Sequence, residues 1–148
     1  MTGIVTYPPY RVGPLPAAEV NMRMRALVTL LGGFNYRYGS EVQLHATLAQ
    51  VLLDAGLEFV REFQIDQQNR ADFWLPLGDG GLVLEVKVDG SVGDALRQVG
   101  RYAALDRVRG VVLASTCRWA RPELANLTVT GNWSGKPGLV AHLPRQSL

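Results

Sequence analysis

Four residues far apart in the chain have the types and spacing that phosphate chemistry needs: Glu41, Asp72, Glu85 and Lys87. Residues 82–88 are an apolar run with two charges, and strand alternation puts Glu85 and Lys87 on one face. Asp72 belongs to the preceding strand candidate and points to the same side if the register of the two strands allows it. Glu41 begins a helix whose apolar stripe leads back to it. We therefore expect three carboxylates and one ammonium group to converge on an apolar scaffold.

Such a convergence is unfavourable without a compensating charge. Two like charges ~4 Å apart at an effective dielectric constant of about 20 repel by about 4 kcal/mol, and a third carboxylate adds to this. Hard divalent cations such as Mg²⁺ take carboxylate oxygens as ligands, keep several waters and bind substrate phosphate at the remaining positions. The ion polarises a phosphoryl oxygen and acidifies a bound water, and a nearby lysine orients that water or stabilises the developing charge. These residue types predict metal-dependent phosphodiester hydrolysis, with Mg²⁺ or Mn²⁺ as cofactor.

The elements that position these residues are marked by periodicity and by end signals. Ser40 is an N-cap candidate, Gln43 is its capping-box partner, and Gly56 follows the last apolar residue of that helix. Short turn-rich connections favour an antiparallel meander of three strands, and the strand, helix and strand that follow predict a parallel pair. The expected elements are helices over residues 17–31, 41–55 and 91–106, strands over 58–65, 70–75, 82–88 and 110–115, and edge strands over 127–130 and 139–143.

The order of these residues and elements resembles the PD-(D/E)XK nuclease superfamily, with Ala71 standing where that family often has proline. The resemblance covers residues 39–115 and implies an α/β fold with a restriction endonuclease-like αβββαβ core, its mixed central sheet flanked by helices. The implied site has Asp72 and Glu85 as metal ligands, the Val86 carbonyl as a further ligand, Lys87 at the attacking water and Glu41 as an additional acidic ligand.

A second element supports the same resemblance. Gln98 and Tyr102 look like the Gln-x-x-x-Tyr element that follows Glu-x-Lys in RecB-like members, so Gln98 is expected in the catalytic set. The expected substrate contacts are His45, Arg70, Arg101 and Tyr102. A polar residue at the border of a helix stripe and a core tyrosine are the alternative interpretations of Gln98 and Tyr102.

Each residue of the expected metal site also has an alternative interpretation as a structural residue. Glu85 and Lys87 alone are typical of a solvated strand face with an ion pair, and Asp72 is also a plausible turn acceptor at a strand end. An acid at the first position of a helix is favoured by the helix dipole without any function, which applies to Glu41. His45 is the right type for a half-buried packing residue. Only the combination of these residues favours a metal site over the separate structural roles.

Length and composition limit the class of protein. The chain has 148 residues with 47% apolar composition, which is enough for one core. The net charge is +2, so any nucleic-acid surface must be local, although 13 of the 15 basic residues are arginine. Cys117 is the single cysteine, and no secretory signal is visible, so we expect a cytoplasmic protein without disulfides.

The sequence is expected to form a single domain. Residues 1–38 are an N-terminal arm and helix, residues 39–115 the nuclease core, and residues 116–148 a C-terminal extension packed on the core. DNA is the expected substrate, with endonuclease action favoured over exonuclease action. So small a domain is expected to act as a homodimer or within a larger complex, away from membranes. A non-catalytic nucleic-acid- or protein-binding module on the same scaffold is the alternative.

Overall fold

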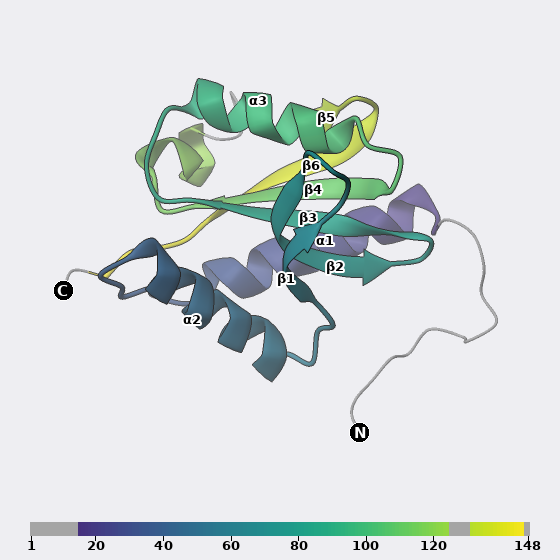
Figure 1. Ribbon diagram of the computed structural model, residues 1–148. Coiled ribbons are helices and arrows are strands. Elements are labelled where there is room, and N and C mark those ends of the chain that lie inside the picture. The colour runs from purple at the N-terminus through teal and green to yellow at the C-terminus, as the bar shows by residue number, and fades with distance from the viewer. Residues whose placement is uncertain (1–14, 125–130, 147–148) are drawn as a thin grey trace.

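The computed structural model describes residues 15–124 and 131–146 (Figure 1). Two helices come first in the chain, and strands and helices then follow. They are α1 (Ala17–Gly32), α2 (Glu41–Asp54), β1 (Val60–Gln64), β2 (Arg70–Leu77), β3 (Gly80–Lys87), α3 (Val92–Ala103), β4 (Val108–Ser115), the 3-10 helix η1 (Arg118–Ala120), β5 (Gly131–Trp133) and β6 (Lys136–His142).

Six strands form one mixed sheet in the order β1-β2-β3-β4-β6-β5. β1, β2 and β3 are an antiparallel meander, as their short connections predicted. β3 and β4 are parallel, as the intervening helix predicted, and β6 continues the parallel part. β5 runs antiparallel to β6 at the far edge. The protein is therefore α/β, with a mixed sheet flanked by helices.

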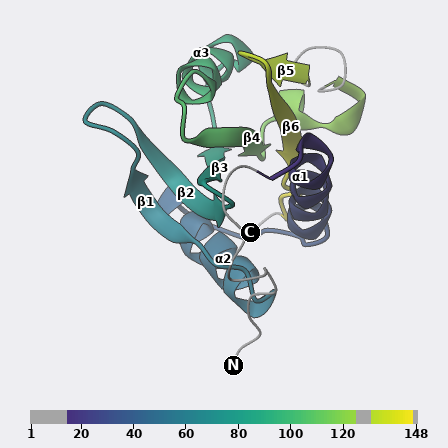
Figure 2. The same ribbon diagram turned by 90° about the vertical axis from the view of Figure 1, so that its right-hand side faces the viewer.

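The two faces of the sheet are covered by different helices (Figure 2). Buried residues of α1 and α2 join one apolar cluster with Leu82, Leu84 and Val86 of β3, whereas buried residues of α3 join a second cluster with Val83. The alternation expected for residues 82–88 is thus confirmed. Glu85, which follows the same alternation as Val83, belongs to the α3 side of the sheet.

The helices begin where the sequence signals place them. The Ser40 hydroxyl accepts a hydrogen bond from the Gln43 N–H, and the Gln43 side chain accepts one from the Gly39 N–H, so a capping box fixes the start of α2. Gly56, just beyond α2, has a φ of 75°, a conformation that glycine adopts without strain. Ser91 caps α3 in the same way through the Asp94 N–H. Local sequence therefore fixes the N-termini of both α2 and α3.

The C-terminal part differs from the expectation in one respect. Residues 139–143 were expected at an edge, but β6 lies inside the sheet, hydrogen-bonded to β4 on one side and β5 on the other. The expectation was wrong because the C-terminal sequence has no clear strand pattern that would have predicted β5, the short strand that pairs with the outer edge of β6. The other expected edge strand, residues 127–130, lies outside the described residues.

The segment between α1 and α2 is hydrogen-bonded to the C-terminal end of the described chain. Tyr36 forms a parallel bridge with Arg145, its N–H donates to the Pro144 carbonyl, and its carbonyl accepts from the Gln146 N–H. The Tyr36 hydroxyl donates to the Leu31 carbonyl at 2.6 Å, which fixes the turn after α1. No helix in the described ranges has the length and apolar character needed to cross a membrane.

Candidate metal centre

The regular ladder between β2 and β3 stops where the two acids begin. The last paired residues are Phe73 and Leu84. One residue further, the Asp72 N–H donates to Glu85 Oε1 at 3.2 Å, and the Val86 N–H donates to Asp72 Oδ2 at 2.8 Å. In a regular ladder, backbone N–H groups donate to backbone carbonyls of the neighbouring strand. Here the two carboxylates accept these hydrogen bonds in place of carbonyls. Asp72 and Glu85 are brought together by the register, as the sequence required.

β2 is also loosened from its other neighbour at the same residue. The β1–β2 register pairs Arg61 with Phe73 and Phe63 with Ala71, and it skips Glu62 opposite Asp72. Glu62 has a φ of 49°, in the left-handed region that non-glycine residues seldom occupy. Asp72 therefore lies at an interruption of both ladders of β2, and its side chain is half-buried.

The second oxygen of Glu85 is held by α3. Gln98 Nε2 donates to Glu85 Oε2 at 2.6 Å and to the Tyr102 hydroxyl at 3.2 Å, so both amide hydrogens of Gln98 have an acceptor. The Tyr102 hydroxyl donates to the Arg70 carbonyl at 2.7 Å and lies 3.4 Å from Glu85 Oε2. Because Gln98 and Tyr102 are one helical turn apart, they reach the sheet from the same side. Glu85 is held by hydrogen bonds from both β2 and α3.

Burial makes the charge on Glu85 unfavourable. The side chain is only 3% exposed. The pKa of Glu85 is raised to about 8. Loss of water is the largest cause and the negative charge of Asp72 the next, while the Asp72 N–H and the charge of Lys87 oppose the rise. Burial, followed by the charge of Glu85, also raises the pKa of Tyr102. The pocket thus favours a proton or a cation beside the two carboxylates.

The available donors fit a hard divalent ion. Three of the four carboxylate oxygens accept the hydrogen bonds described above, while Asp72 Oδ1 accepts none from the described residues. In a strand, the N–H and C=O of one residue leave toward the same neighbour, so the Val86 carbonyl faces Asp72 as well. Two carboxylates and a carbonyl match the oxygen ligands that Mg²⁺ takes while keeping several waters.

The expected third carboxylate is not part of this arrangement. In the part of the chain that the structure describes, no three His, Cys, Asp or Glu side chains gather closely enough to hold an ion. Glu41 is largely exposed and lies 3.6 Å from His45 Nε2, and the His45 ring leans on Phe73 with 5.8 Å between ring centres. α2 covers the face opposite α3. The structure does not bring Glu41 and His45 to the Asp72–Glu85 pair, because the apolar stripe of α2 packs under Phe73.

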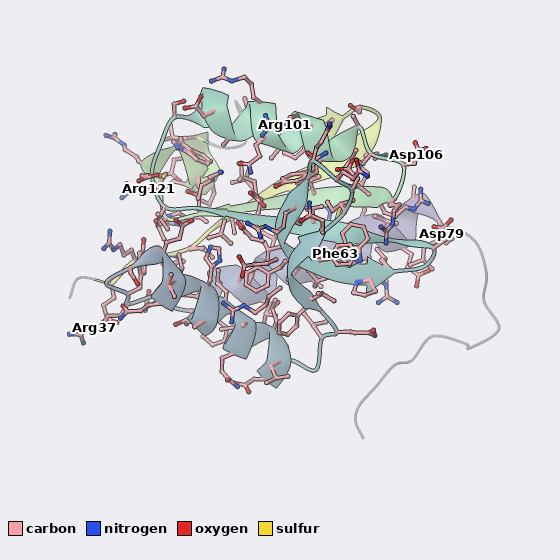
Figure 3. The ribbon with its side chains drawn as sticks, in the orientation of Figure 1. Arg37, Phe63, Asp79, Arg101, Asp106 and Arg121 are labelled. Carbon is pink, nitrogen blue, oxygen red and sulfur yellow. The ribbon has the colours of Figure 1, made fainter. Side chains whose placement is uncertain are left out.

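Three cationic residues belong to the elements that carry the site: Lys87 to β3, Arg70 to β2 and Arg101 to α3. Lys87 follows Glu85 on the same face of β3, is half-buried, and lowers the pKa of Glu85 through its charge. Arg70 precedes Asp72 by two residues and is exposed. Arg101 is also exposed and belongs to α3, where Figure 3 labels it. Within the described ranges, none of these three cationic groups has a hydrogen bond or an ion pair of its own. All three positive charges are free to meet an anion.

Sequence reasoning missed two features of the site. It considered Tyr102 as a substrate contact or as a core residue, but not the role the structure shows: the ring is 3% exposed, and its hydroxyl links the Arg70 carbonyl to Gln98. It also missed the backbone N–H groups of Asp72 and Val86, which only the register between β2 and β3 reveals. A tyrosine one turn after Gln98 on a buried stripe was the available signal for the first feature.

Comparisons with protein-family models, with curated proteins and with solved structures find no match for this chain.

Proposed function

We propose that this protein is a divalent-metal-dependent nuclease that hydrolyses DNA phosphodiester bonds, as its resemblance to the PD-(D/E)XK superfamily implies. The interlocked pair of Asp72 and Glu85 is the observation that carries the proposal. Two neighbouring ionised carboxylates are costly, since like charges ~4 Å apart repel by about 4 kcal/mol at a dielectric constant near 20, and the charge of Asp72 raises the pKa of Glu85. The hydrogen bonds between the two strands do not require both groups to be charged, whereas a cation site does.

Each residue of the site has a part in this scheme. Asp72, Glu85 and the Val86 carbonyl would hold Mg²⁺ or Mn²⁺, which would supply Lewis acidity when bound. Lys87 lies on the same face and stabilises negative charge that develops at the phosphate. Gln98 and Tyr102 keep Glu85 oriented toward Asp72.

The exposed arginines complete the proposed site. Arg70 on β2 and Arg101 on α3 are exposed and are proposed to contact neighbouring phosphates through their guanidinium groups. The restriction endonuclease-like core is part of the proposal, and its element order runs α2, β1, β2, β3, α3, β4. Endonuclease action is favoured, with DNA as the partner that the site engages through its backbone.

The test is cleavage of single-stranded, duplex and branched DNA in the presence of Mg²⁺ or Mn²⁺. We expect cleavage by the wild type, its loss with a chelator, and its loss in Asp72→Asn and Glu85→Gln. Asp79→Asn is the matched control, because Asp79 belongs to the β2–β3 turn and pairs with Arg109, away from the site.

Undiminished cleavage in the Asp72 or Glu85 variant contradicts the assigned site. DNA binding that needs no divalent ion, without cleavage of any of these substrates, identifies a non-catalytic binding module instead.

A further inference from the structure

The parallel strands β3, β4 and β6 end at one edge of the sheet, where their last residues form a row. Lys87 of β3 is paired with Ser115 of β4, and Ser115 is paired with His142 of β6. Because neighbouring strands lie about 4.8 Å apart, the row from Lys87 to His142 is about 10 Å long. The carboxyl ends of parallel strands are where open α/β sheets bind their ligands. Lys87 follows Glu85 on the same face of β3, so the row begins beside the candidate metal centre.

Exposed arginines surround this row. Arg118 begins η1, three residues after Ser115, and Arg145 comes three residues after His142, so each Cα lies within about 11 Å of the row. Two further arginines are exposed, and Figure 3 shows both of them on the same side of the molecule. We refer to the four arginines and the lysine as the basic edge: Arg37, Lys87, Arg118, Arg121 and Arg145.

Side-chain contacts connect one half of the basic edge to the row. The Arg145 guanidinium carbon lies 4.4 Å from the centre of the Tyr38 ring, and the Tyr38 hydroxyl donates to Thr116 Oγ1 at 2.8 Å. The Thr116 N–H in turn donates to the Lys87 carbonyl at 3.3 Å. Arg37 directly precedes Tyr38 in the chain. These three cations therefore lie around one connected group of residues, although they come from three distant parts of the sequence.

The other half of the basic edge lies at the β6 end of the row. Burial lowers the pKa of the half-buried His142, the charge of Arg121 lowers it further, and Glu123 opposes the fall. Arg121 is therefore close enough to His142 to act on its charge. Trp119 Nε1 donates to the Gly90 carbonyl at 3.2 Å, which holds η1 against the loop that follows β3.

The cations of the basic edge have no ion pair within the described ranges. The arginine ion pairs of the described residues lie elsewhere, within α1, within α3, and between β4 and the β2–β3 turn. Three exposed acids are near the basic edge, Asp89, Glu123 and Glu41, and Glu41 already lies against His45. Five cations and three acids leave an excess of positive charge, which an anionic partner would neutralise. The planar fork of arginine fits phosphate oxygens in a bidentate way.

We propose that the basic edge binds the sugar-phosphate backbone of DNA next to the phosphate that the candidate metal centre engages. The choice of DNA as the partner rests on the proposed function. A row of about 10 Å corresponds to about three consecutive phosphates, since one strand of a duplex carries a charge every 3.4 Å along the helix axis. Contacts of this kind fix the position of the strand without reading its bases. The basic edge therefore binds DNA of any sequence.

The first test is DNA binding by the full chain, measured by fluorescence anisotropy in a chelator at several salt concentrations. Each cation that contacts a phosphate of duplex DNA adds about 0.9 to the slope of log Kd against the logarithm of the salt concentration. The combined variant Arg118→Gln with Arg121→Gln should lower this slope by about 2 and weaken binding about tenfold or more. Circular dichroism confirms that the variant folds.

Two further variants control for the position and the sign of the charge. Arg25→Gln is the matched control, because Arg25 is an exposed arginine of α1 with no ion pair in the described ranges. We expect it to bind DNA as the wild type does. Asp89→Asn should tighten binding, because it removes a negative charge beside the basic edge.

The second test separates the basic edge from the candidate metal centre. Bis(p-nitrophenyl) phosphate is a diester with a single phosphate, so it reaches the ion site without occupying the basic edge. The combined variant should hydrolyse this diester at the wild-type rate, whereas its KM for DNA should rise about tenfold with little change in kcat, as the loss of uniform binding predicts. DNA binding with the expected salt dependence but without cleavage would contradict the proposed function and leave the basic edge in place.

Equal DNA affinity of the wild type and the combined variant, or an equal loss of affinity in Arg25→Gln, overturns the proposal. Loss of hydrolysis of the small diester in the combined variant overturns it as well, because the two arginines would then support the fold or the ion site. Binding to phosphatidylserine vesicles without binding to DNA identifies a membrane-binding surface instead.

Discussion

Asp72 and Glu85 are bound to each other's strands: the Glu85 carboxylate accepts the Asp72 N–H, and the Asp72 carboxylate accepts the Val86 N–H. The two side chains are therefore part of the connection between β2 and β3 as well as a proposed ion site. Substitutions that keep the hydrogen bond while removing the charge separate these two roles.

Asp72→Asn and Asp72→Ala should differ in the metal-free protein. Asparagine keeps an oxygen for the Val86 N–H and removes the repulsion with Glu85, so its free energy of unfolding should equal or exceed that of the wild type. Alanine leaves that N–H without its acceptor, which costs about 1–3 kcal/mol. Urea denaturation in a chelator measures both. Equal destabilisation by the two substitutions would show that the carboxylate charge itself stabilises the strand pair.

The stability of the metal-free protein should fall as the pH rises. The pKa of Glu85 is raised in the folded state to about 8, against an ordinary value of 4.5. Between these values the folded state binds more protons than the unfolded state, so the free energy of unfolding decreases with pH. The loss is on the order of a few kcal/mol and is complete above the folded pKa.

Denaturation at pH 5 and at pH 9 measures this loss, and Glu85→Gln should remove most of it. Mg²⁺ should reduce the loss in the wild type, because a cation replaces the proton. A wild-type stability that is independent of pH over this range would argue against the buried, uncompensated charge.

The fold could be predicted from the sequence where local patterns are strong, and less well where tertiary contacts decide. The capping box at Ser40 and the alternation around Glu85 fixed elements and faces correctly. The interior position of β6 was missed, because it depends on pairing with β5, and the sequence of β5 has no clear strand pattern.

The candidate site shows the same division. Asp72 and Glu85 could be placed on neighbouring strands from their spacing, since a short turn joins these strands, but the register that brings them together was left open. The position of Glu41 could not, because helical periodicity identifies the buried stripe of α2 but not which face of the sheet that stripe covers. Its placement depends on packing between α2 and Phe73.

Tyr102→Phe should weaken both the fold and the ion site. The substitution removes the hydroxyl that joins the Arg70 carbonyl to Gln98, at a cost of about 1 kcal/mol. Without it Glu85 is held less firmly, so Mn²⁺ affinity measured by calorimetry should fall several-fold. Tyr36→Phe is the matched control, because its buried hydroxyl donates to the Leu31 carbonyl near the end of α1. Equal Mn²⁺ affinities in the two variants would limit Tyr102 to a structural role.

Lys87→Met should separate ion binding from turnover. The lysine contributes a positive charge beside Glu85, so its removal should leave Mn²⁺ affinity unchanged or slightly higher. DNA cleavage should fall by about 10²-fold or more, as when another group that stabilises transition-state charge is removed. Lys136→Met is the control, since the Lys136 amine donates to the Leu105 carbonyl, beyond the end of α3. Normal cleavage by Lys87→Met would exclude the proposed role.

The central claim is that Asp72 and Glu85 hold a divalent cation, and anomalous scattering from Mn²⁺-soaked crystals tests it most directly. We predict a single strong peak within coordination distance of both carboxylates and of the Val86 carbonyl, absent in crystals of Asp72→Asn. Crystals saturated with Mn²⁺ that show no peak there, or a peak of the same strength in the Asp72→Asn variant, would contradict the account.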